Sequence, residues 1–454
     1  MGVPTIFALA SAPGRAGVAV IRLSGPQCAK ILQSLTRRAL PTPRQAVLRA
    51  LYRPDDGVVL DQAIILWLPA PHSFTGEDML ELHGHGGRAV LQRVTAALAA
   101  FPQTRLAEPG EFSRRGFENG KFDLTTAEAI ADLVQAETEA QADQALRQMG
   151  GALSELYDTW AKQLTACLAH LEASIDFSDE ELPTDLAQLQ FTALQDLAEA
   201  ISAHLADGRR GERLRDGYQI AILGAPNAGK SSLLNWLAQR DAAIVSAIAG
   251  TTRDIVEVQF DLGGYPVVLA DTAGLREATD LIEQEGIRRA KARAQQADLK
   301  LLVFDAAALP ELDPFTLDQA NDSSLIIINK TDLLTKPADD CAWEKTLGGP
   351  HKPIFVSLRT GDGMAAFLTA LQDHVAGALQ DRGQPSLTRV RHRTALEECL
   401  SSLRQAVCGL TEQQEMALVA EDVRQSMRAL GRITGRVDVE DLLDVIFRDF
   451  CIGK

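Results

Sequence analysis

The chain has 454 residues, too many for one compact core, and at roughly 150 residues per domain it should form about three domains. Hydrophobic residues make up 46% and charged residues 23%, which is typical of a globular protein and excludes a disordered or fibrous one. The net charge of -16 disfavours nonspecific nucleic-acid binding by the whole protein, so an RNA substrate would require a local basic patch or a basic partner.

The first part of the chain combines strand and helix signals. Short apolar runs bounded by turn residues at positions 18–23 and 63–68 predict strands, and the apolar residues of positions 89–98 follow a helical period. We interpret residues 1–120 as a small α+β domain.

Apolar residues then recur every three or four positions, first over residues 153–175 and, beyond Pro183, over residues 186–201. This spacing predicts long amphipathic helices. The same period returns over residues 396–407 and 419–430. We therefore expect residues 121–216 and 381–454 to form one helical domain with another domain inserted into it.

Two arginine-rich stretches flank the expected insertion. One, at residues 209–215, lies in an expected linker over residues 207–217, and the other spans residues 389–393. Two interpretations stay open for them: solvated linker charge, or part of a surface that binds RNA.

From residue 218 to about 378, strand-like segments alternate with helical ones, which is the pattern of a parallel-sheet α/β domain. Alternating apolar and polar residues at 256–262 and an apolar run at 265–270, joined by Gly263 and Gly264, add a hairpin signal. We expect residues 217–380 to form the inserted domain.

Within this domain, Gly224-Ala-Pro-Asn-Ala-Gly229-Lys230-Ser231 follows a predicted strand and precedes a predicted helix, which is the context of a phosphate-binding loop. Its glycines let backbone N–H groups point inward, and the helix N-terminus adds positive potential. Lys230 would reach the β- and γ-phosphates of a nucleotide, and the Ser231 hydroxyl would bind Mg²⁺.

Further segments follow in the order of a guanine-nucleotide site. Thr252 offers a second hydroxyl for Mg²⁺, and Asp271 can reach the ion through water. Asp332, in Asn329-Lys330-Thr-Asp332, can accept both N–H groups of the pyrimidine edge of guanine, which adenine does not offer, so the site should select GTP. The expected GTP-binding residues are Asn227, Ala228, Gly229, Lys230, Ser231, Ser232, Gly250, Thr251, Thr252, Asp271, Thr272, Ala273, Gly274, Asn329, Lys330, Asp332, Ser357, Leu358 and Arg359. The sequence thus predicts a Ras-like P-loop GTPase domain of α/β type.

The residue after Gly274 departs from the Ras-type pattern. Ras-type switches place a water-orienting glutamine there, whereas this chain has Leu275, which cannot orient water. Hydrolysis then needs another water-positioning group and another positive charge near the phosphates. Glu277 and Glu283 are the candidates for the first role, and both could equally be solvated helix charges.

Six further segments occur outside these nucleotide motifs: Ala12-Pro-Gly-Arg15, Val20-Ile-Arg22-Leu-Ser-Gly25, Phe74-Thr-Gly-Glu-Asp78, Glu81-Leu-His-Gly-His-Gly-Gly87, Pro109-Gly-Glu-Phe112 and Phe450-Cys-Ile-Gly-Lys454. With them the chain resembles, over essentially its whole length, the family of tRNA uridine 5-carboxymethylaminomethyl modification GTPases called MnmE or TrmE. The resemblance implies a P-loop GTPase domain inserted in an α-helical domain, preceded by an N-terminal α+β domain that binds folate and dimerises the protein.

In this family hydrolysis depends on potassium, which stands where an arginine finger would. The resemblance places Asn227 and oxygens of Ser246, Ile248 and Thr251 around K⁺, an all-oxygen set suited to a hard cation. It favours Glu283 over Glu277 as the residue that positions water. It also extends the GTP-binding set over the potassium loop, with Ser246, Ala247, Ile248 and Ala249, and this loop orders when two such domains meet. Ser246, Ala247 and Leu358 differ from the commoner family residues.

The resemblance further implies a bound 5-formyl- or methylene-tetrahydrofolate. By motif position Arg22, Glu81 and Lys121 match the folate contacts, with Lys454 reaching in, whereas without the resemblance the first three would be ordinary surface ion pairs. Cys451 matches a cysteine important for the modification, and the alternative is a small buried hydrophobe near the chain end. Histidines 83 and 85 are too few for a metal site, so we expect them to serve backbone positioning.

The implied function is potassium-stimulated GTP hydrolysis that drives modification of the wobble uridine of certain tRNAs by a homodimer, with Lys230, Asp271, Glu283 and Cys451 as catalytic residues. Its partner would be the flavoprotein MnmG, in a heterotetramer whose basic surface carries most of the tRNA affinity. Flavin would bind to the partner, because this chain has no GxGxxG fingerprint. Two alternatives stay open: a regulatory GTPase that performs no modification, and a folate-dependent methyltransferase that needs no partner.

The cysteines and the N-terminal sequence bear on location. The six cysteines are scattered, with neither a CxxC pair nor a His/Cys cluster at zinc spacing, so we expect reduced thiols rather than a disulfide framework. Residues 1–12 lack a basic region followed by a clear apolar run, and no segment approaches the ~18 consecutive apolar residues of a membrane span. We therefore expect a cytoplasmic protein that is neither exported nor inserted in a membrane.

Overall fold

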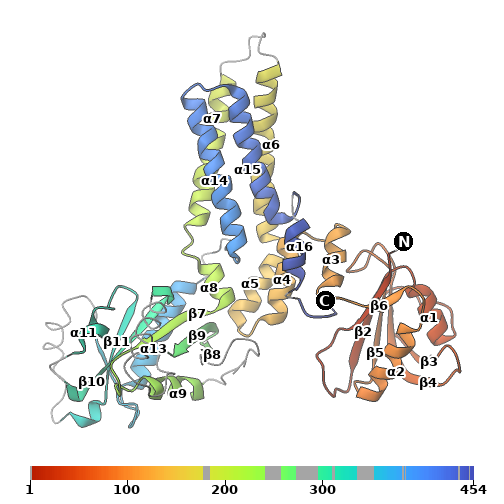
Figure 1. The fold of residues 1–454 in the computed structure, drawn as a ribbon, viewed down its shortest axis with the longest axis horizontal. Coiled ribbons are helices and arrows are strands. Elements are labelled where there is room, and N and C mark those ends of the chain that lie inside the picture. The colour runs from red at the N-terminus through yellow and green to blue at the C-terminus, as the bar shows by residue number, and fades with distance from the viewer. Residues whose placement is uncertain are drawn as a thin grey trace, which may run out of the picture. The chain divides into compact units, whose positions relative to one another are not determined.

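The computed structural model describes residues 3–176, 185–240, 257–271, 295–308, 312–334, 352–380, 383, 385–437, 440–448 and 450–453 (Figure 1). These residues form two units. Unit 1 comprises Met1–Ala131, Gln148–Gln195 and Glu398–Lys454, and unit 2 comprises Asp132–Arg147 and Asp196–Glu397. Within the described ranges, no helix has the length and apolar character needed to cross a membrane.

A mixed sheet with two helices forms the N-terminal part of unit 1. Its strands follow the order β3-β4-β5-β2-β1-β6, with β1 and β6 parallel and the other pairs antiparallel. The elements are β1 (Thr5–Leu9), β2 (Ala19–Ser24), α1 (Cys28–Thr36), β3 (Val47–Tyr52), β4 (Val59–Leu68), β5 (Met79–Gly84), α2 (Arg88–Ala99) and β6 (Thr104–Leu106). The predicted α+β architecture is confirmed.

Alternation along β5 gives this sheet two different faces. Leu80 and Leu82 are buried and pack with apolar residues of α1 and α2 in the main core of the sheet. Glu81 and His83 alternate with them, so their side chains lie on the opposite face. One face therefore packs in the main core, and the other combines polar groups with a smaller buried cluster that includes Met79 and Phe112.

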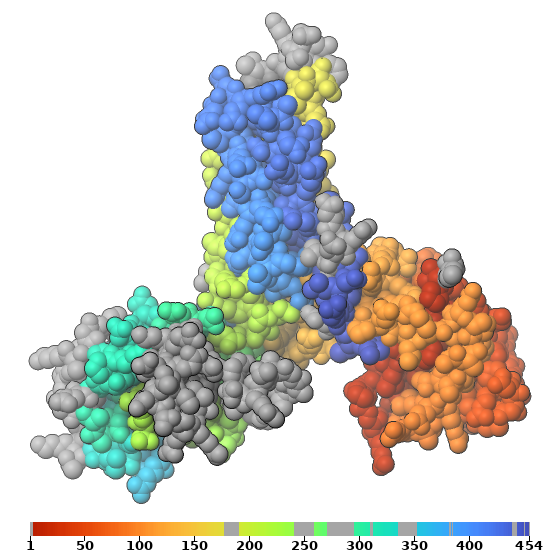
Figure 2. Space-filling view, in the orientation of Figure 1, coloured from red at the N-terminus to blue at the C-terminus, as the bar shows by residue number. Residues whose placement is uncertain are grey.

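The C-terminal segment returns to this sheet. Helices α3 (Glu111–Glu118) and α16 (Glu440–Arg448) contact each other, and in the space-filling view the C-terminal segment in dark blue lies against orange residues that include α3 (Figure 2). An apolar cluster with Phe117, Phe447 and Phe450 holds this contact. Beyond it, Ile452 forms an isolated antiparallel bridge with Pro109.

Long helices account for the rest of unit 1. α6 (Ala152–Asp176) packs along α15 (Met416–Thr434), and each buries one apolar stripe with helical spacing, as the sequence predicts. Of the other helices, α4 (Leu124–Gln135), α7 (Asp185–Leu205) and α14 (Val390–Thr411) lie partly in unit 1, whereas α8 (Arg210–Asp216) and most of α5 (Glu139–Met149) belong to unit 2.

Unit 2 contains the second six-stranded sheet, with the order β12-β11-β10-β7-β9-β8. Its pairs are parallel except for the β8–β9 hairpin, whose Gly263 and Gly264 both have positive φ, as a type I′ turn requires. The elements are β7 (Tyr218–Leu223), α9 (Lys230–Arg240), β8 (Glu257–Leu262), β9 (Tyr265–Asp271), β10 (Leu299–Asp305), the 3₁₀ turn η1 (Ala306–Ala308), α11 (Pro314–Leu317), β11 (Ser324–Asn329), η2 (Thr331–Leu333), β12 (Ile354–Phe355) and α13 (Met364–Leu379). The predicted parallel α/β sheet and its hairpin are confirmed.

The linker expected over residues 207–217 is wrong, because the chain forms α8 there and its arginines are engaged in ion pairs. Arg213 pairs with Asp298 at 2.7 Å, and Arg215 pairs with Asp132 at 3.0 Å. In the second arginine-rich stretch, Arg389 also pairs with Asp132, at 2.7 Å, and Arg393 with the buried Glu212, at 2.8 Å. These four arginines each have a carboxylate partner, which fits neither a solvated linker nor a free basic patch.

Candidate functional site

The phosphate loop joins the end of β7 to the start of α9 (Figure 1). A Cβ atom on Gly224 would clash with the Val303 carbonyl oxygen of β10, so the loop leaves the sheet only with glycine there. Asn227 and Gly229 have left-handed φ angles of 64° and 108°. A Cβ on Gly229 would clash with Asn329, so this glycine lets the second motif approach the loop.

The first turn of α9 places a cation and two hydroxyls at the helix N-terminus. Lys230 Nζ donates to the carbonyl oxygens of Gly224 and Ala225, both at 2.8 Å. Ser231 and Ser232 follow it and are exposed. A lysine amine, free backbone N–H groups and the positive end of a helix together form a site for phosphate groups.

Asn329 holds the predicted segments together. Its side chain is 3% exposed, its Nδ2 donates to the Ala228 carbonyl oxygen at 2.8 Å, and its Oδ1 accepts from the Leu358 N–H at 3.2 Å. One buried amide therefore ties the phosphate loop to the loop of residues 357–359. The two segments lie 130 positions apart in the sequence from residue 228 to residue 358.

The remaining members of this group lie around Asp332. The Ser357 hydroxyl donates to Asp332 Oδ1 at 2.7 Å, which holds the carboxylate in one orientation. Arg359 NH1 lies 3.7 Å from Asp332 Oδ2, but the arginine side chain is 82% exposed, so this pair contributes little. Lys330 has a left-handed φ of 66° and pairs with Asp305 at the end of β10, at 2.6 Å.

The sheet topology explains why these residues meet. β7, β10, β11 and β12 are parallel neighbours, so their carboxyl ends lie at one edge of the sheet. The chain order reverses around β7, and ligands of open α/β sheets bind at such a switch point. The structure thus brings together the described members of the predicted site in the phosphate loop, at residues 329–332 and at residues 357–359.

Other predicted residues lie outside the described residues. These are Ser246, Ala247, Ile248, Ala249, Gly250, Thr251, Thr252, Thr272, Ala273, Gly274, Leu275, Glu277, Glu283 and Lys454. Asp271 is the last residue of β9, which pairs in parallel with β7, so its backbone lies at the same sheet edge. Its side chain is outside the description as well.

A second polar group lies on the other face of the N-terminal sheet, beside a smaller buried cluster that includes Met79 and Phe112. Arg22 of β2 and Glu81 of β5 are direct cross-strand neighbours, and Nε and NH2 of Arg22 donate to Glu81 Oε1 at 3.0 and 2.9 Å. Arg22 NH1 also donates to the Gly453 carbonyl oxygen at 3.3 Å. The guanidinium lies 5.9 Å from the ring centroids of both Phe74 and Phe112, so aromatic surface borders this ion pair.

Two further predicted residues border this group. Lys121 Nζ donates to the Pro71 carbonyl oxygen at 2.9 Å, and its side chain passes close to Gly76. Cys451 is exposed and has a free thiol, which contradicts the alternative of a small buried hydrophobe. Gly453 lies against β1, where a Cβ would clash with the Leu9 carbonyl oxygen.

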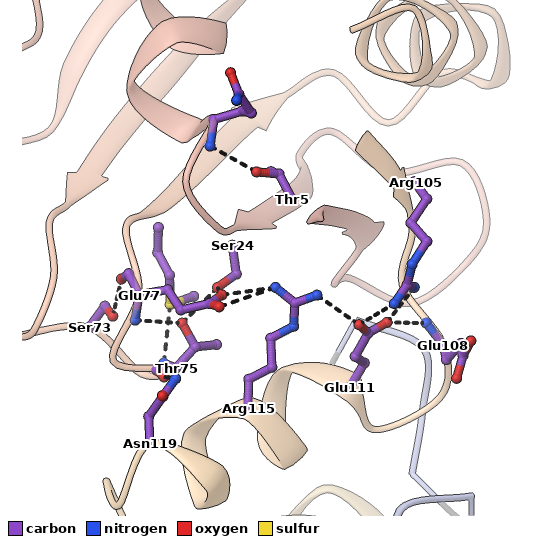
Figure 3. A network of polar contacts seen from close by, with 12 residues as sticks. Thr5, Ser24, Ser73, Thr75, Glu77, Arg105, Glu108, Glu111, Arg115 and Asn119 are labelled. Atoms are coloured by element: carbon purple, nitrogen blue, oxygen red, sulfur yellow. Dashed lines mark hydrogen bonds and ion pairs between the residues drawn. The ribbon is translucent and has the colours of Figure 1, made fainter. Parts of the chain in front are cut away.

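The sequence did not predict the buried chain of charges beside this group, drawn in Figure 3. Arg115 of α3 is 6% exposed and donates to Glu77 at 3.0 Å and to Glu111 at 2.9 Å. Arg105 of β6 makes a two-pronged contact with Glu111 at 2.6 and 2.7 Å. Glu77 also accepts from the Ser24 hydroxyl at 2.6 Å. One sequence signal could have indicated this contact: the segments Phe74-Thr-Gly-Glu-Asp78 and Pro109-Gly-Glu-Phe112 each contain a glutamate. Both glutamates, Glu77 and Glu111, contact Arg115.

These contacts determine the ionisation of Glu111. Burial alone would raise the pKa of its carboxyl group, but hydrogen bonds from Arg105, the Glu108 N–H and Arg115 outweigh it and lower the pKa. Glu111 therefore remains charged and holds both arginines at neutral pH.

Comparison with known proteins gives consistent findings. A family model described as the GTP-binding protein TrmE N-terminus matches residues 5–121, and one described as the MnmE helical domain matches residues 124–451. The tRNA modification GTPase MnmE of Parvibaculum lavamentivorans is 53% identical over 450 residues, which cover 99% of this chain and 100% of that protein. The tRNA modification GTPase MnmE of Rhodospirillum rubrum is 54% identical over 466 residues, which cover 100% of this chain and 100% of that protein. The mitochondrial 5-taurinomethyluridine-[tRNA] synthase subunit GTPB3 of Danio rerio is 47% identical over 100% of this chain and 94% of its own length.

Proposed function

Because this chain belongs to the MnmE family of tRNA modification GTPases, we propose that it modifies the wobble uridine of certain tRNAs at the 5-position and that potassium stimulates its GTP hydrolysis. The protein is a GTP hydrolase that acts in tRNA modification. The alternative of a regulatory GTPase that performs no modification is thereby set aside. The observation that carries the proposal is 53% identity over nearly the whole chain.

The nucleotide roles follow from the position of each residue. Lys230 would bind the β- and γ-phosphates, and Asp332, held by Ser357, would accept the two N–H groups of guanine. Mg²⁺ prefers hard oxygen donors: Ser231 and Thr252 would hold it, with Asp271 acting through water. When bound, the ion neutralises charge on the phosphates.

Asn227 supports the potassium proposal. It lies in the phosphate loop with an exposed side chain, so its amide oxygen can face a cation bound beside the phosphates. We propose that Ser246, Ile248 and Thr251 supply the other oxygens when two nucleotide-binding domains meet in a homodimer. Glu283 would then position the attacking water in place of the glutamine that Leu275 replaces.

The second polar group supports a folate site on the N-terminal sheet. Arg22 and Glu81 are partly exposed, at 22% and 16%, and the rings of Phe74 and Phe112 lie beside them. A flat pterin ring offers hydrogen-bond donors and acceptors at its edge and an apolar face, which fits this combination. The cationic Lys121 and Lys454 suit the carboxylates of the same ligand. Tetrahydrofolate bound here would supply a one-carbon unit.

We propose MnmG as the flavoprotein partner, in a heterotetramer around a dimer of this chain. The name of the Danio rerio relative supports the proposal in two respects, because it specifies a modified uridine in tRNA and a synthase subunit. The net charge of -16 also favours a partner that provides the basic surface for tRNA. The exposed thiol of Cys451 would lie at the folate site, where we place it in the modification chemistry.

Steady-state GTP hydrolysis in potassium against sodium tests the central part of this proposal. We expect the full-length protein to hydrolyse GTP at least about tenfold faster in potassium, since a cation at the β–γ bridge replaces an arginine finger. Asn227→Ala should abolish the difference while leaving GTP binding in place. Equal wild-type rates in the two salts would overturn the potassium role.

The modification itself is tested with the partner present. We expect the 5-modified wobble uridine, detected by mass spectrometry of digested tRNA, only when GTP, folate and MnmG are all added. Product formed without MnmG would favour the alternative of a methyltransferase that needs no partner.

A further inference from the structure

His83 in β5 and His85, which directly follows this strand, have different surroundings. His83 Nε2 lies 3.1 Å from Glu81 Oε2, and His85 Nδ1 lies 2.7 Å from Asp61 Oδ1. The side chain of His83 is 28% exposed and that of His85 is 67% exposed. Both imidazoles are therefore oriented by a carboxylate, but His83 is more enclosed.

Glu81 connects His83 to the cationic group of the proposed folate site. One carboxylate oxygen of Glu81 binds Arg22, and the other faces His83. The cross-strand neighbours of His83 are the apolar Val20 on β2 and Ile64 on β4. The charged groups that face His83 are thus Glu81 from its own strand and, behind it, Arg22 from β2.

This contact determines which ring nitrogen of His83 can react. When Nε2–H donates to Glu81, Nδ1 carries the lone pair, and it has no hydrogen-bond partner among the residues that the structure describes. A carboxylate on one ring nitrogen stabilises the imidazolium that forms when the other nitrogen takes a proton. Arg22 in turn keeps Glu81 in place, since three of its nitrogens are engaged with Glu81 and the Gly453 carbonyl oxygen.

From this geometry we propose that His83 is the proton-transfer residue of the N-terminal site and that Glu81 orients it. The inference rests on the proposed folate function. In the transfer of a formyl unit, an amine or thiol nucleophile forms a bond to the formyl carbon, and the single bond from that carbon to the carrier nitrogen breaks. Nδ1 of His83 takes the proton that the nucleophile loses and returns it to the leaving nitrogen, which keeps the bonding electron pair. The exchange is redox neutral and needs no reactant besides this nucleophile and the carrier.

The test compares His83→Gln with the matched variant His85→Gln in the full-length protein, assayed with MnmG, GTP, folate and tRNA. We expect His83→Gln to lower the rate of uridine modification about 100-fold, which is the contribution of one general acid–base group, while His85→Gln stays within about twofold of wild type. GTP hydrolysis should remain unchanged in both variants, which shows that they fold.

Two readouts are independent of turnover. Calorimetry should give the same affinity for 5-formyltetrahydrofolate in wild type and in His83→Gln, within about threefold, because the residue moves a proton and does not supply binding energy. In protein labelled with ¹⁵N-histidine, addition of 5-formyltetrahydrofolate should move the His83 signals and leave those of His85 in place.

Different results overturn different parts of this account. If wild type does not bind 5-formyltetrahydrofolate, the proposed folate function itself is wrong. If wild type binds it and His83→Gln retains the wild-type rate of modification, only the role of His83 is wrong. An equal loss in His83→Gln and His85→Gln would likewise overturn that role, since it would indicate a shared structural effect.

Discussion

The two six-stranded sheets build their polar groups in different places. In the sheet of unit 2, the groups lie on loops at the edge where parallel strands end, and each loop is a short contiguous motif. In the N-terminal sheet of unit 1, they lie on the face, where Arg22 meets Glu81 through the register of β2 and β5.

This difference decides what each site depends on. The edge site depends on backbone geometry, because glycines and left-handed residues let the loops approach one another. The face site depends on side-chain charges that are partly or wholly buried, with Arg115 and Glu111 as the extreme case. Four sets of measurements would break or sharpen the contrast.

The largest effect should follow removal of the buried arginine. Arg115→Ala leaves Glu77 and Glu111 without their shared partner inside the protein, and breaking such a pair should cost about 3–5 kcal/mol of stability. Urea unfolding of the full chain would measure it. Arg105→Ala is the matched control: its side chain is 42% exposed and Glu111 keeps Arg115, so the loss should stay near 1 kcal/mol. Similar losses in the two variants would contradict the buried-charge account.

Next in size is the loss of the phosphate-binding lysine. Lys230→Ala should lower kcat for GTP hydrolysis by about 10²- to 10³-fold, since it removes a positioned cation from the phosphate site. Folate binding, measured by calorimetry, should not change, because the face site shares no residue with the edge site. Lys300→Ala, on β10 and bonded to the Gln319 carbonyl oxygen, serves as control and should hydrolyse GTP normally. A parallel loss of folate binding would show that the two sites are not separable.

Acid should act on the two regions in different pH ranges. In unit 2, burial lowers the pKa of His204 to about 4 against the opposing effect of the Asp207 carboxylate, while Arg393 and His392 lower it further. A His whose folded pKa lies below its unfolded value of 6.5 stabilises fully above pH 6.5, and this contribution, of the order of 3 kcal/mol, is lost as the pH falls toward 4. In unit 1, the folded pKa of Glu111 is lowered from its unfolded value of 4.5. The stability that Glu111 contributes is therefore present above pH 4.5 and is lost only at lower pH.

Urea unfolding at pH 7 and pH 5 would separate these contributions. Wild type should be less stable at pH 5, and His204→Leu should remove most of that difference. If the variant keeps the full pH dependence, another group is responsible.

The smallest effects distinguish the two charges near the guanine position. Asp332→Asn should weaken GTP binding about 100-fold, because its amide cannot accept both N–H groups of guanine. Arg359→Ala should change the affinity by less than about threefold, since the arginine is 82% exposed and its pair with Asp332 is long. Fluorescence titration with a labelled GTP analogue measures both. A larger effect for Arg359 than for Asp332 would contradict the assignment of the guanine contact.

The sequence by itself determined the nucleotide motifs, the parallel sheet that carries them and the long helices, because each depends on short-range spacing. The phosphate loop needs residues 224–231 in one run, and α6 needs an apolar stripe with a helical period, so both are legible without coordinates. The sequence also identified the N-terminal segments through resemblance, but not what joins them.

Only the tertiary structure decided the contacts that join distant charges. Arg22 contacts Glu81 because of strand register, and it contacts Gly453 because the C-terminal segment returns to the sheet. Arg115 contacts Glu77 because of the way α3 packs. The helix α8, expected as a linker, is held by ion pairs with residues as far away as Asp298 and Arg393. Charged side chains pair by proximity in space, and local sequence patterns record periodicity but not which distant partner neutralises a buried charge.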